Sequence, residues 1–114
     1  MLNNVILLGR LTADPELKEI GKEGKVVNFT LAVGRKFKNA EGEYDTDFIQ
    51  CNIWNKLAEN MSEYCHKGDL IAVEGALQTS TYEDKEGQKR YKTEVRVDNV
   101  TFVSTKKVDV KDGE

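Results

Sequence analysis

Five stretches of this sequence carry the residue pattern of a β-strand, whereas a helical pattern occurs only once. The last four stretches place apolar side chains at alternate positions, which is typical of a strand with one face in a core. The first stretch is apolar on both faces, so both of its faces need cover. We predict these strands at residues 4–11, 26–37, 44–54, 70–79 and 91–102, and a shorter extended piece at 17–20. The chain must therefore fold into a mainly β domain.

The fifth strand contains a break in its alternation. Its apolar residues lose step by one position between Val97 and Val100. One extra residue in a strand, which is a β-bulge, shifts the faces in this way. We therefore expect a bulge or a break near Asp98 and Asn99.

The helical pattern lies between the third and fourth strands, at residues 56–66. An apolar stripe at helical spacing is formed by Leu57, Met61, Tyr64 and Cys65. Asn55 is the expected N-cap, and Gly68 is the expected stop. Five strands with one helix between the third and the fourth predict an all-β OB-fold, a Greek-key barrel that binds its ligand over strands two and three and the neighbouring loops.

The third strand places two large aromatic side chains on its polar face. Phe48 and Trp54, the only tryptophan, alternate there with the amides Gln50 and Asn52. Leaving a Phe-sized side chain in water forfeits about 1.5–3 kcal/mol of burial, so a partner should cover it. The two rings are about 20 Å apart along an extended strand, which suits a long, repetitive ligand such as single-stranded nucleic acid. A core or interface position, or a bulge that turns Trp54 inward, would also explain the pattern.

The charge balance argues against a generally basic nucleic-acid binder. The 114 residues include 17 Lys and Arg against 20 Asp and Glu, which gives a net charge of −3. Cations nevertheless stand beside aromatic residues at 35–38, 54–56 and 89–92. Nucleic acid would therefore need a local cationic groove. The second strand outruns its core pattern, so Arg35 and Phe37 are expected at a rim or on a projecting hairpin.

The remaining chemistry of the chain is sparse. Cys51 and Cys65 lie on apolar faces and are expected to be buried, without a disulfide. One histidine, His66, is too little for a metal site or a catalytic triad. We therefore expect no enzyme activity, no metal and no cofactor. No apolar run approaches the ~20 residues of a membrane span, and no signal peptide is visible, so a soluble, cytoplasmic protein without membrane contact is expected.

Several ordered segments resemble the bacterial and phage single-stranded DNA-binding protein family. The opening stretch carries Gly9-Arg-Leu11 and Asp14-Pro-Glu16 at the family's positions. Further matching segments are Thr30-Leu-Ala-Val33, Lys56-Leu-Ala-Glu59, Tyr64-x-x-Lys-Gly68, Glu74-Gly-x-Leu-Gln-Thr79 and Arg90-Tyr-x-Thr-Glu-Val95. The resemblance covers about residues 1–102. It implies sequence-independent binding and protection of single-stranded DNA in replication, recombination or repair.

The resemblance also assigns roles to individual residues. The family's base-stacking aromatics fall on Phe37, Phe48, Trp54 and Tyr82. This chain has Phe or Tyr where many relatives carry Trp, and Trp where many carry Phe. The candidate phosphate contacts along the same track are Arg10, Arg35, Lys36, Lys38, Lys56, Arg90 and Lys92.

The resemblance further implies a homotetramer in which the first strand helps to pair subunits. We expect a single-stranded DNA-binding domain at residues 1–104 and a short, disordered tail at 105–114. That tail lacks the apolar anchor of the acidic tip through which relatives recruit replication proteins, so such recruitment is not expected. The alternative function is an OB-fold accessory subunit of primosome type, whose rings face a protein partner. Oligosaccharide binding is a third use of the fold, which the cationic flanks disfavour.

Overall fold

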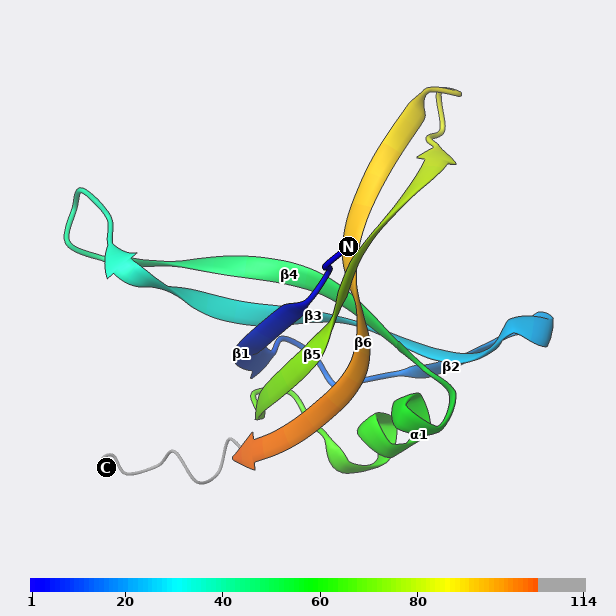
Figure 1. The fold of residues 1–114 in the computed structure, drawn as a ribbon, viewed down its shortest axis with the longest axis horizontal. Helices are drawn as coiled ribbons and strands as arrows, with labels where there is room; N and C mark the ends of the chain where they lie inside the picture. Colours follow the sequence, from blue (N-terminus) through cyan, green and yellow to red (C-terminus); the bar gives the residue numbers. More distant parts are fainter. Residues whose placement is uncertain (105–114) are drawn as a thin grey trace.

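The computed structural model describes residues 1–104 and consists mainly of strands (Figure 1). Its elements are β1 (Val5–Leu11), β2 (Leu17–Ile20), the short 3₁₀ helix η1 (Gly21–Glu23), β3 (Gly24–Lys38), β4 (Tyr44–Trp54), α1 (Asn55–Tyr64), β5 (Leu70–Glu83) and β6 (Lys89–Ser104). The five predicted strands and the short extended piece are all present. The predicted tail at 105–114 lies outside the described residues.

Five of the strands close into a barrel. The sheet runs in the order β1-β5-β6-β4-β3-β2, and β1 also pairs with β3 through Arg10↔Ala32 and Leu11↔Leu31. The pairing of β4 with β6 is parallel, while the other pairings are antiparallel. With α1 between β4 and β5, this arrangement confirms the predicted OB-fold.

The barrel core is built from the inward positions of the alternating strands. Its largest fully buried side chains include Leu31, Ile53, Ile71 and Val73. Both cysteines are free and buried, as the sequence predicts. Burial raises the pKa of the Cys51 thiol to about 12 and that of Cys65 to about 11. Because the thiolate is the reactive form, these residues act as small apolar side chains.

Helix α1 corrects part of the sequence interpretation. It buries Ala58 and Met61, whereas the predicted stripe members Leu57 and Tyr64 are exposed. The helix packs mainly on β3 and β4, so only a narrow face meets the barrel. Asn55 is the first helical residue and not the N-cap: it has a φ of 57°, and its Oδ1 accepts a hydrogen bond from the Lys25 backbone at 3.1 Å.

The predicted bulge in the last strand is confirmed. In the β5–β6 ladder Glu74 lies opposite Asn99 and Gly75 lies opposite Val97, which leaves Asp98 without a cross-strand partner. The slip restores the inward position of the residues that follow. It therefore explains why the apolar pattern changes step.

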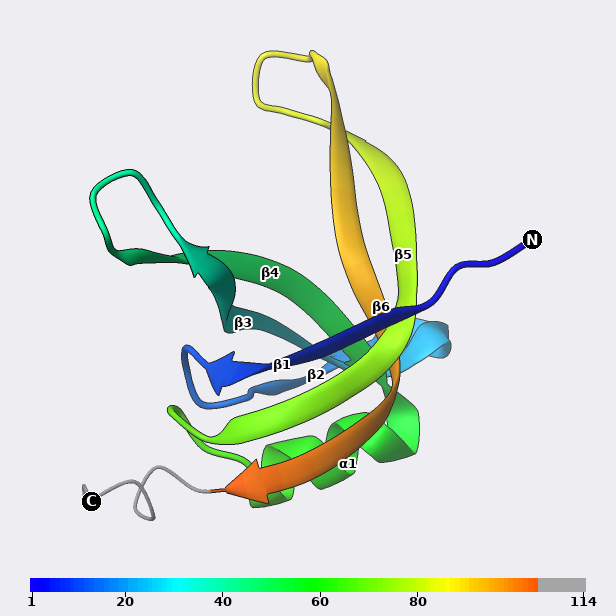
Figure 2. The ribbon, with the colours of Figure 1, turned by 60° about the vertical axis from the view of Figure 1, so that its left-hand side comes forward.

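Two long hairpins extend beyond the barrel and diverge, as Figure 2 shows. One is formed by β3 and β4, and the other by β5 and β6. The parallel β4–β6 pairing spans only Cys51–Ile53 on β4. Beyond it the two hairpins have no ladder between them, which leaves open space along one flank of the barrel.

Candidate nucleic-acid interface

An open groove of about 880 Å³ lies between β4 and the β5–β6 hairpin. The groove lies where β4 and β6 separate, beyond the short parallel ladder that joins them. Its lining includes two of the predicted stacking residues, Phe48 from β4 and Tyr82 from β5, together with the cation Lys92. The fold therefore brings rings from two different hairpins to one concave surface. The polar side chains Gln50 and Glu94 line the same groove.

Three of the four predicted rings are largely exposed. The exposed fractions are 81% for Phe37, 66% for Phe48 and 52% for Tyr82. Phe37 lies near the end of β3, outside the groove residues. A core position is therefore excluded for these three rings.

Trp54 is partly buried at the far end of β4. Its Nε1 donates a hydrogen bond to Oδ1 of Asn52 at 3.0 Å. The β3–β4 register runs without a break from Val26↔Trp54 to Gly34↔Thr46, so no bulge turns the indole inward. Val26 lies on the same outer face and is only 2% exposed. The indole thus shares the face of Phe48 and helps to cover an apolar neighbour.

Arg96 is a neighbour of Trp54 that our sequence interpretation missed. Its guanidinium carbon lies 5.3 Å from the centre of the indole ring, in a cation–π contact. Arg96 pairs with Asn52 across the parallel ladder, which brings it to the indole. A period-two row of charged residues leads to it along β6, namely Arg90, Lys92, Glu94 and Arg96. That alternation places Arg96 on the same face as Arg90 and Lys92, and it could have identified Arg96 from the sequence.

Two exposed tyrosines were also missing from the predicted set. Tyr91 lines the groove, and Tyr44 stands at the start of β4. Each ring has a lysine ammonium over it, Lys38 at 5.8 Å from Tyr44 and Lys89 at 5.9 Å from Tyr91. The cation-beside-aromatic spacing in the sequence indicated Tyr91 only. Tyr44 has Glu43 and Asp45 beside it in the sequence, and Lys38 reaches it across the β3–β4 pairing.

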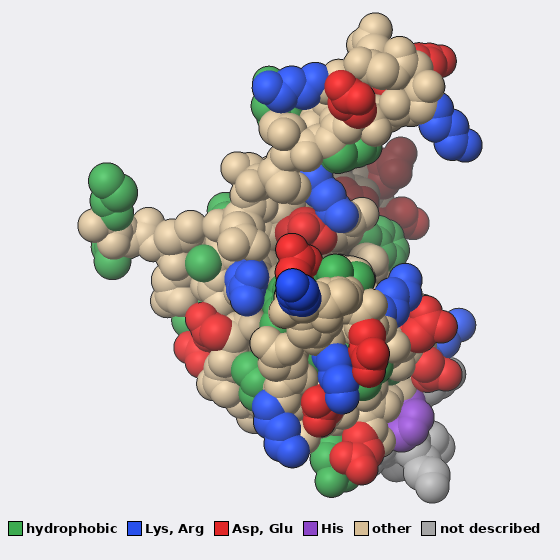
Figure 3. Space-filling view, turned by 90° about the vertical axis from the view of Figure 1, so that its right-hand side faces the viewer, with side chains coloured by type: hydrophobic (Ala, Val, Ile, Leu, Met, Phe, Trp, Pro, Cys, Tyr) green, Lys and Arg blue, Asp and Glu red, His purple; other side chains and the backbone are tan. Residues whose placement is uncertain are grey.

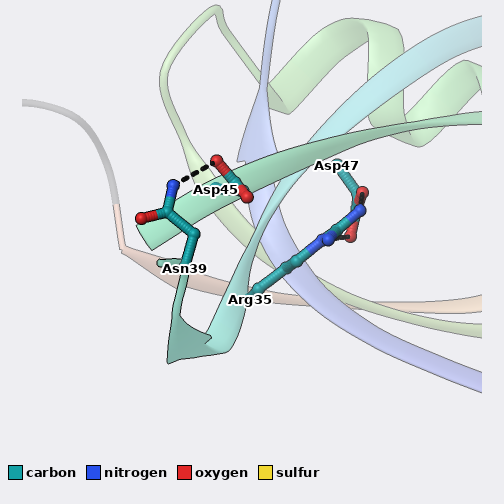
Figure 4. A network of polar contacts seen from close by, with 4 residues as sticks. All are labelled: Arg35, Asn39, Asp45 and Asp47. Atoms are coloured by element: carbon teal, nitrogen blue, oxygen red, sulfur yellow. Dashed lines mark hydrogen bonds and ion pairs between the residues drawn. The ribbon is translucent and has the colours of Figure 1, made fainter. Parts of the chain in front are cut away.

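Arg35 is held by a carboxylate of the neighbouring strand. It donates two hydrogen bonds to Asp47, at 3.0 and 2.9 Å, which Figure 4 shows beside the contact between Asn39 and Asp45. The bond from Arg35 holds the pKa of the Asp47 carboxyl below its usual value, and the pKa of the guanidinium is raised in turn. Asp47 alternates with Phe48, so this ion pair lies on the opposite face of β4 from the ring.

Three more of the predicted cations have partners within the chain. Arg90 bonds Asp84 at 2.9 Å, and Lys92 lies 3.3 Å from Glu94. Hydrogen bonds from the Gln88 backbone and from Arg90 lower the pKa of Asp84. Arg10 donates a hydrogen bond to the Gly68 carbonyl at 2.9 Å and does not line the groove.

The three remaining predicted cations form no ion pair within residues 1–104. Within residues 1–104, the ammonium groups of Lys36 and Lys56 make no hydrogen bond or ion pair, and Lys38 contacts only the Tyr44 ring. On the face shown in Figure 3, basic and acidic side chains are interspersed, including on the β5–β6 hairpin at the top. The groove lies on another face, where its charged lining consists of the cation Lys92 and the carboxylate Glu94, so the purely cationic groove that the sequence required is not present.

Comparison with known proteins identifies the family. The sequence model of the Single-strand binding protein family matches residues 2–103. This chain belongs to that family. Single-stranded DNA-binding protein B of Bacillus subtilis (strain 168) is 48% identical over 106 residues, which cover 93% of this chain and 94% of the relative.

Two further relatives have the same level of similarity. Single-stranded DNA-binding protein 1 of Staphylococcus aureus (strain MSSA476) is 50% identical over 109 residues, covering 96% of this chain and 70% of the relative. Single-stranded DNA-binding protein 1 of Lactococcus lactis subsp. lactis (strain IL1403) is 49% identical over 107 residues, covering 94% of this chain and 71% of the relative.

In residues 1–104 no helix has the length and apolar character to cross a membrane, and no group of three or more potential ligands could hold a metal.

Proposed function

We propose that this chain binds single-stranded DNA without sequence preference and protects it during replication, recombination or repair. The observation that carries the proposal is the open groove in which Phe48 and Tyr82 meet from two hairpins. Unpaired bases stack on such rings with about 1–3 kcal/mol each, almost independently of base identity. Phe37 and Trp54 extend the track beyond the groove. Family membership and the names of the relatives support this function.

The phosphates of the strand would meet two kinds of cation. Lys36, Lys38 and Lys56 are paired with no carboxylate of residues 1–104 and are the first contacts. The paired cations Arg35, Arg90 and Lys92 must exchange a carboxylate for a phosphate, which reduces the gain from each contact. Arg10 is the least suited of the predicted set, because its guanidinium bonds the Gly68 carbonyl. Duplex DNA offers no unstacked bases, so the rings would give it no comparable gain.

We further propose a cytoplasmic homotetramer without catalytic activity or a cofactor. Outward side chains of β1, Ile6 and Leu8, are exposed on the single chain, and a partner subunit would cover them. The family resemblance of the first strand supports the same arrangement. An accessory subunit that acts through protein partners is the competing function.

A titration with fluorescently labelled oligothymidine tests this proposal. We expect tight binding at low salt, weak binding to a duplex of the same length, and a log–log salt slope of about −2 or steeper per subunit, since each phosphate contact contributes about 0.7. Light scattering on the same samples should give four times the chain mass of 12.9 kDa. Weak binding to both DNAs would favour the accessory subunit. A 12.9 kDa species that still binds would reject only the tetramer.

A further inference from the structure

A second, smaller hollow lies on the outer face of the barrel. It measures about 300 Å³ and is bordered by the β1–β2 connection at residues 12–14. Its polar lining comes from this connection and from three strands, namely Thr12 and Asp14 on the connection, Asn28 and Thr30 on β3, Gln50 on β4, and Lys92 and Glu94 on β6. The volume is many times the ~30 Å³ share of one water molecule, so one pyrimidine base can enter.

The lining contains two carboxylates, Asp14 and Glu94. Asp14 accepts a hydrogen bond from the Lys67 backbone at 2.8 Å, so Glu94 is the carboxylate that can face a base. It is a carboxylate on the path proposed for a polyanion, and its side chain is only 17% exposed. It lines the hollow and the large groove alike, so it stands at their junction. Its carboxylate is held by Lys92, whose Nζ lies 3.3 Å from Oε2. The carboxylate oxygens disfavour a phosphate beside them, but they can accept a hydrogen bond from an amino group on the edge of a base.

The hollow also lies at the right place along the track. Gln50 stands on the outer face of β4 between Phe48 and Trp54. The side-chain amides of Gln50 and Asn28 make no hydrogen bond within residues 1–104, so their donors and acceptors are available. A base that is stacked near these rings can therefore turn its edge toward two amides and a carboxylate.

We propose that this hollow is a base-edge subsite in which Glu94 accepts a hydrogen bond from the exocyclic amino group of a base. A carboxylate only accepts, so it matches the 4-amino group of cytosine and is repelled by the carbonyl oxygen that thymine has at the same position. The amides of Gln50 and Asn28 serve the remaining edge atoms. The inference rests on the proposed single-strand binding and adds a preference for amino-bearing bases at one position.

The test compares oligocytidine with oligothymidine of equal length at neutral pH. The ratio of their dissociation constants, thymidine over cytidine, should fall about fivefold or more in Glu94→Gln, because an amide can accept from the amino group of cytosine or donate to the carbonyl of thymine and so no longer discriminates between them. Glu83→Gln removes the same charge from the end of β5, outside both hollows, and should leave the ratio at the wild-type value. If Glu94→Gln strengthens both oligomers equally, the carboxylate only opposes phosphates and the subsite is rejected.

A second measurement needs no variant protein. An oligomer of pyrimidin-2-one nucleotides lacks the 4-amino group but keeps the rest of the cytosine edge. Wild-type protein should bind it several-fold more weakly than oligocytidine, and equal affinity would reject the subsite. If wild-type protein binds none of these oligomers, the proposed function itself fails, which is a different outcome from binding without selectivity.

Discussion

Replacing both Phe48 and Trp54 with alanine is expected to weaken oligothymidine binding by at least about thirtyfold, because each stacked base contributes at least about 1 kcal/mol and 1.4 kcal/mol is tenfold in affinity. Phe48 lines the groove, and Trp54 shares its face of β4. Fluorescence anisotropy at one fixed salt concentration measures the loss.

The same variant also separates binding from folding. Phe48 is largely exposed, so its removal should hardly change the free energy of unfolding. Removal of the indole should cost more, since the contact with Arg96 alone contributes about 0.5–1 kcal/mol. Tyr64→Ala, which truncates an exposed ring on α1, is the matched control and should retain full affinity. Unchanged binding in the double variant would show that these rings do not contact the DNA. Global unfolding would show that they are needed for the fold.

Gly75→Ala is expected to destabilise the protein by at least about 3 kcal/mol or to prevent folding, since overpacking at a site without room is among the costliest substitutions. A methyl group at residue 75 would press against the backbone carbonyl of Arg96 and the Cα atom of Val97. All of these are backbone atoms of β6, so no side chain can rotate away. Denaturant unfolding followed by circular dichroism measures the effect.

Gly34→Ala is the control for that substitution. A methyl group at residue 34 meets nothing within 4 Å, and the residue has no positive φ. Its free energy of unfolding should therefore stay within about 1 kcal/mol of wild type. If Gly75→Ala is as stable as Gly34→Ala, β5 and β6 lie further apart at the Asp98 bulge than the backbone contacts of residue 75 indicate.

The sequence predicts the barrel well because strand alternation is a local property. The alternation within one strand indicates which of its side chains face the core. The slip after Val97 was therefore visible without knowledge of the partner strand. The exposed position of Phe48 followed from the same parity argument. The face of α1 was harder, because Ala58 and Leu57 are adjacent and either could begin an apolar stripe. Only the packing on β3 and β4 decides between them.

The partners of the charged residues could not be predicted in the same way. The bond between Arg35 and Asp47 depends on the register across the β3–β4 hairpin. The contact between Arg96 and Trp54 depends on a parallel pairing of strands that are distant in the sequence. Sequence alone gives the number of cations but not which of them a carboxylate already holds. For this reason only the folded structure shows which predicted phosphate contacts are paired with a carboxylate of residues 1–104 and which are not.

The most direct test of the account is the intrinsic fluorescence of Trp54 during titration with unlabelled oligothymidine. Because the chain has one tryptophan, the signal reports a single ring on the outer face of the barrel. We predict strong, saturable quenching with the single strand and little change with a duplex of equal length. Binding detected by anisotropy without any change in the indole emission would contradict base stacking at Trp54.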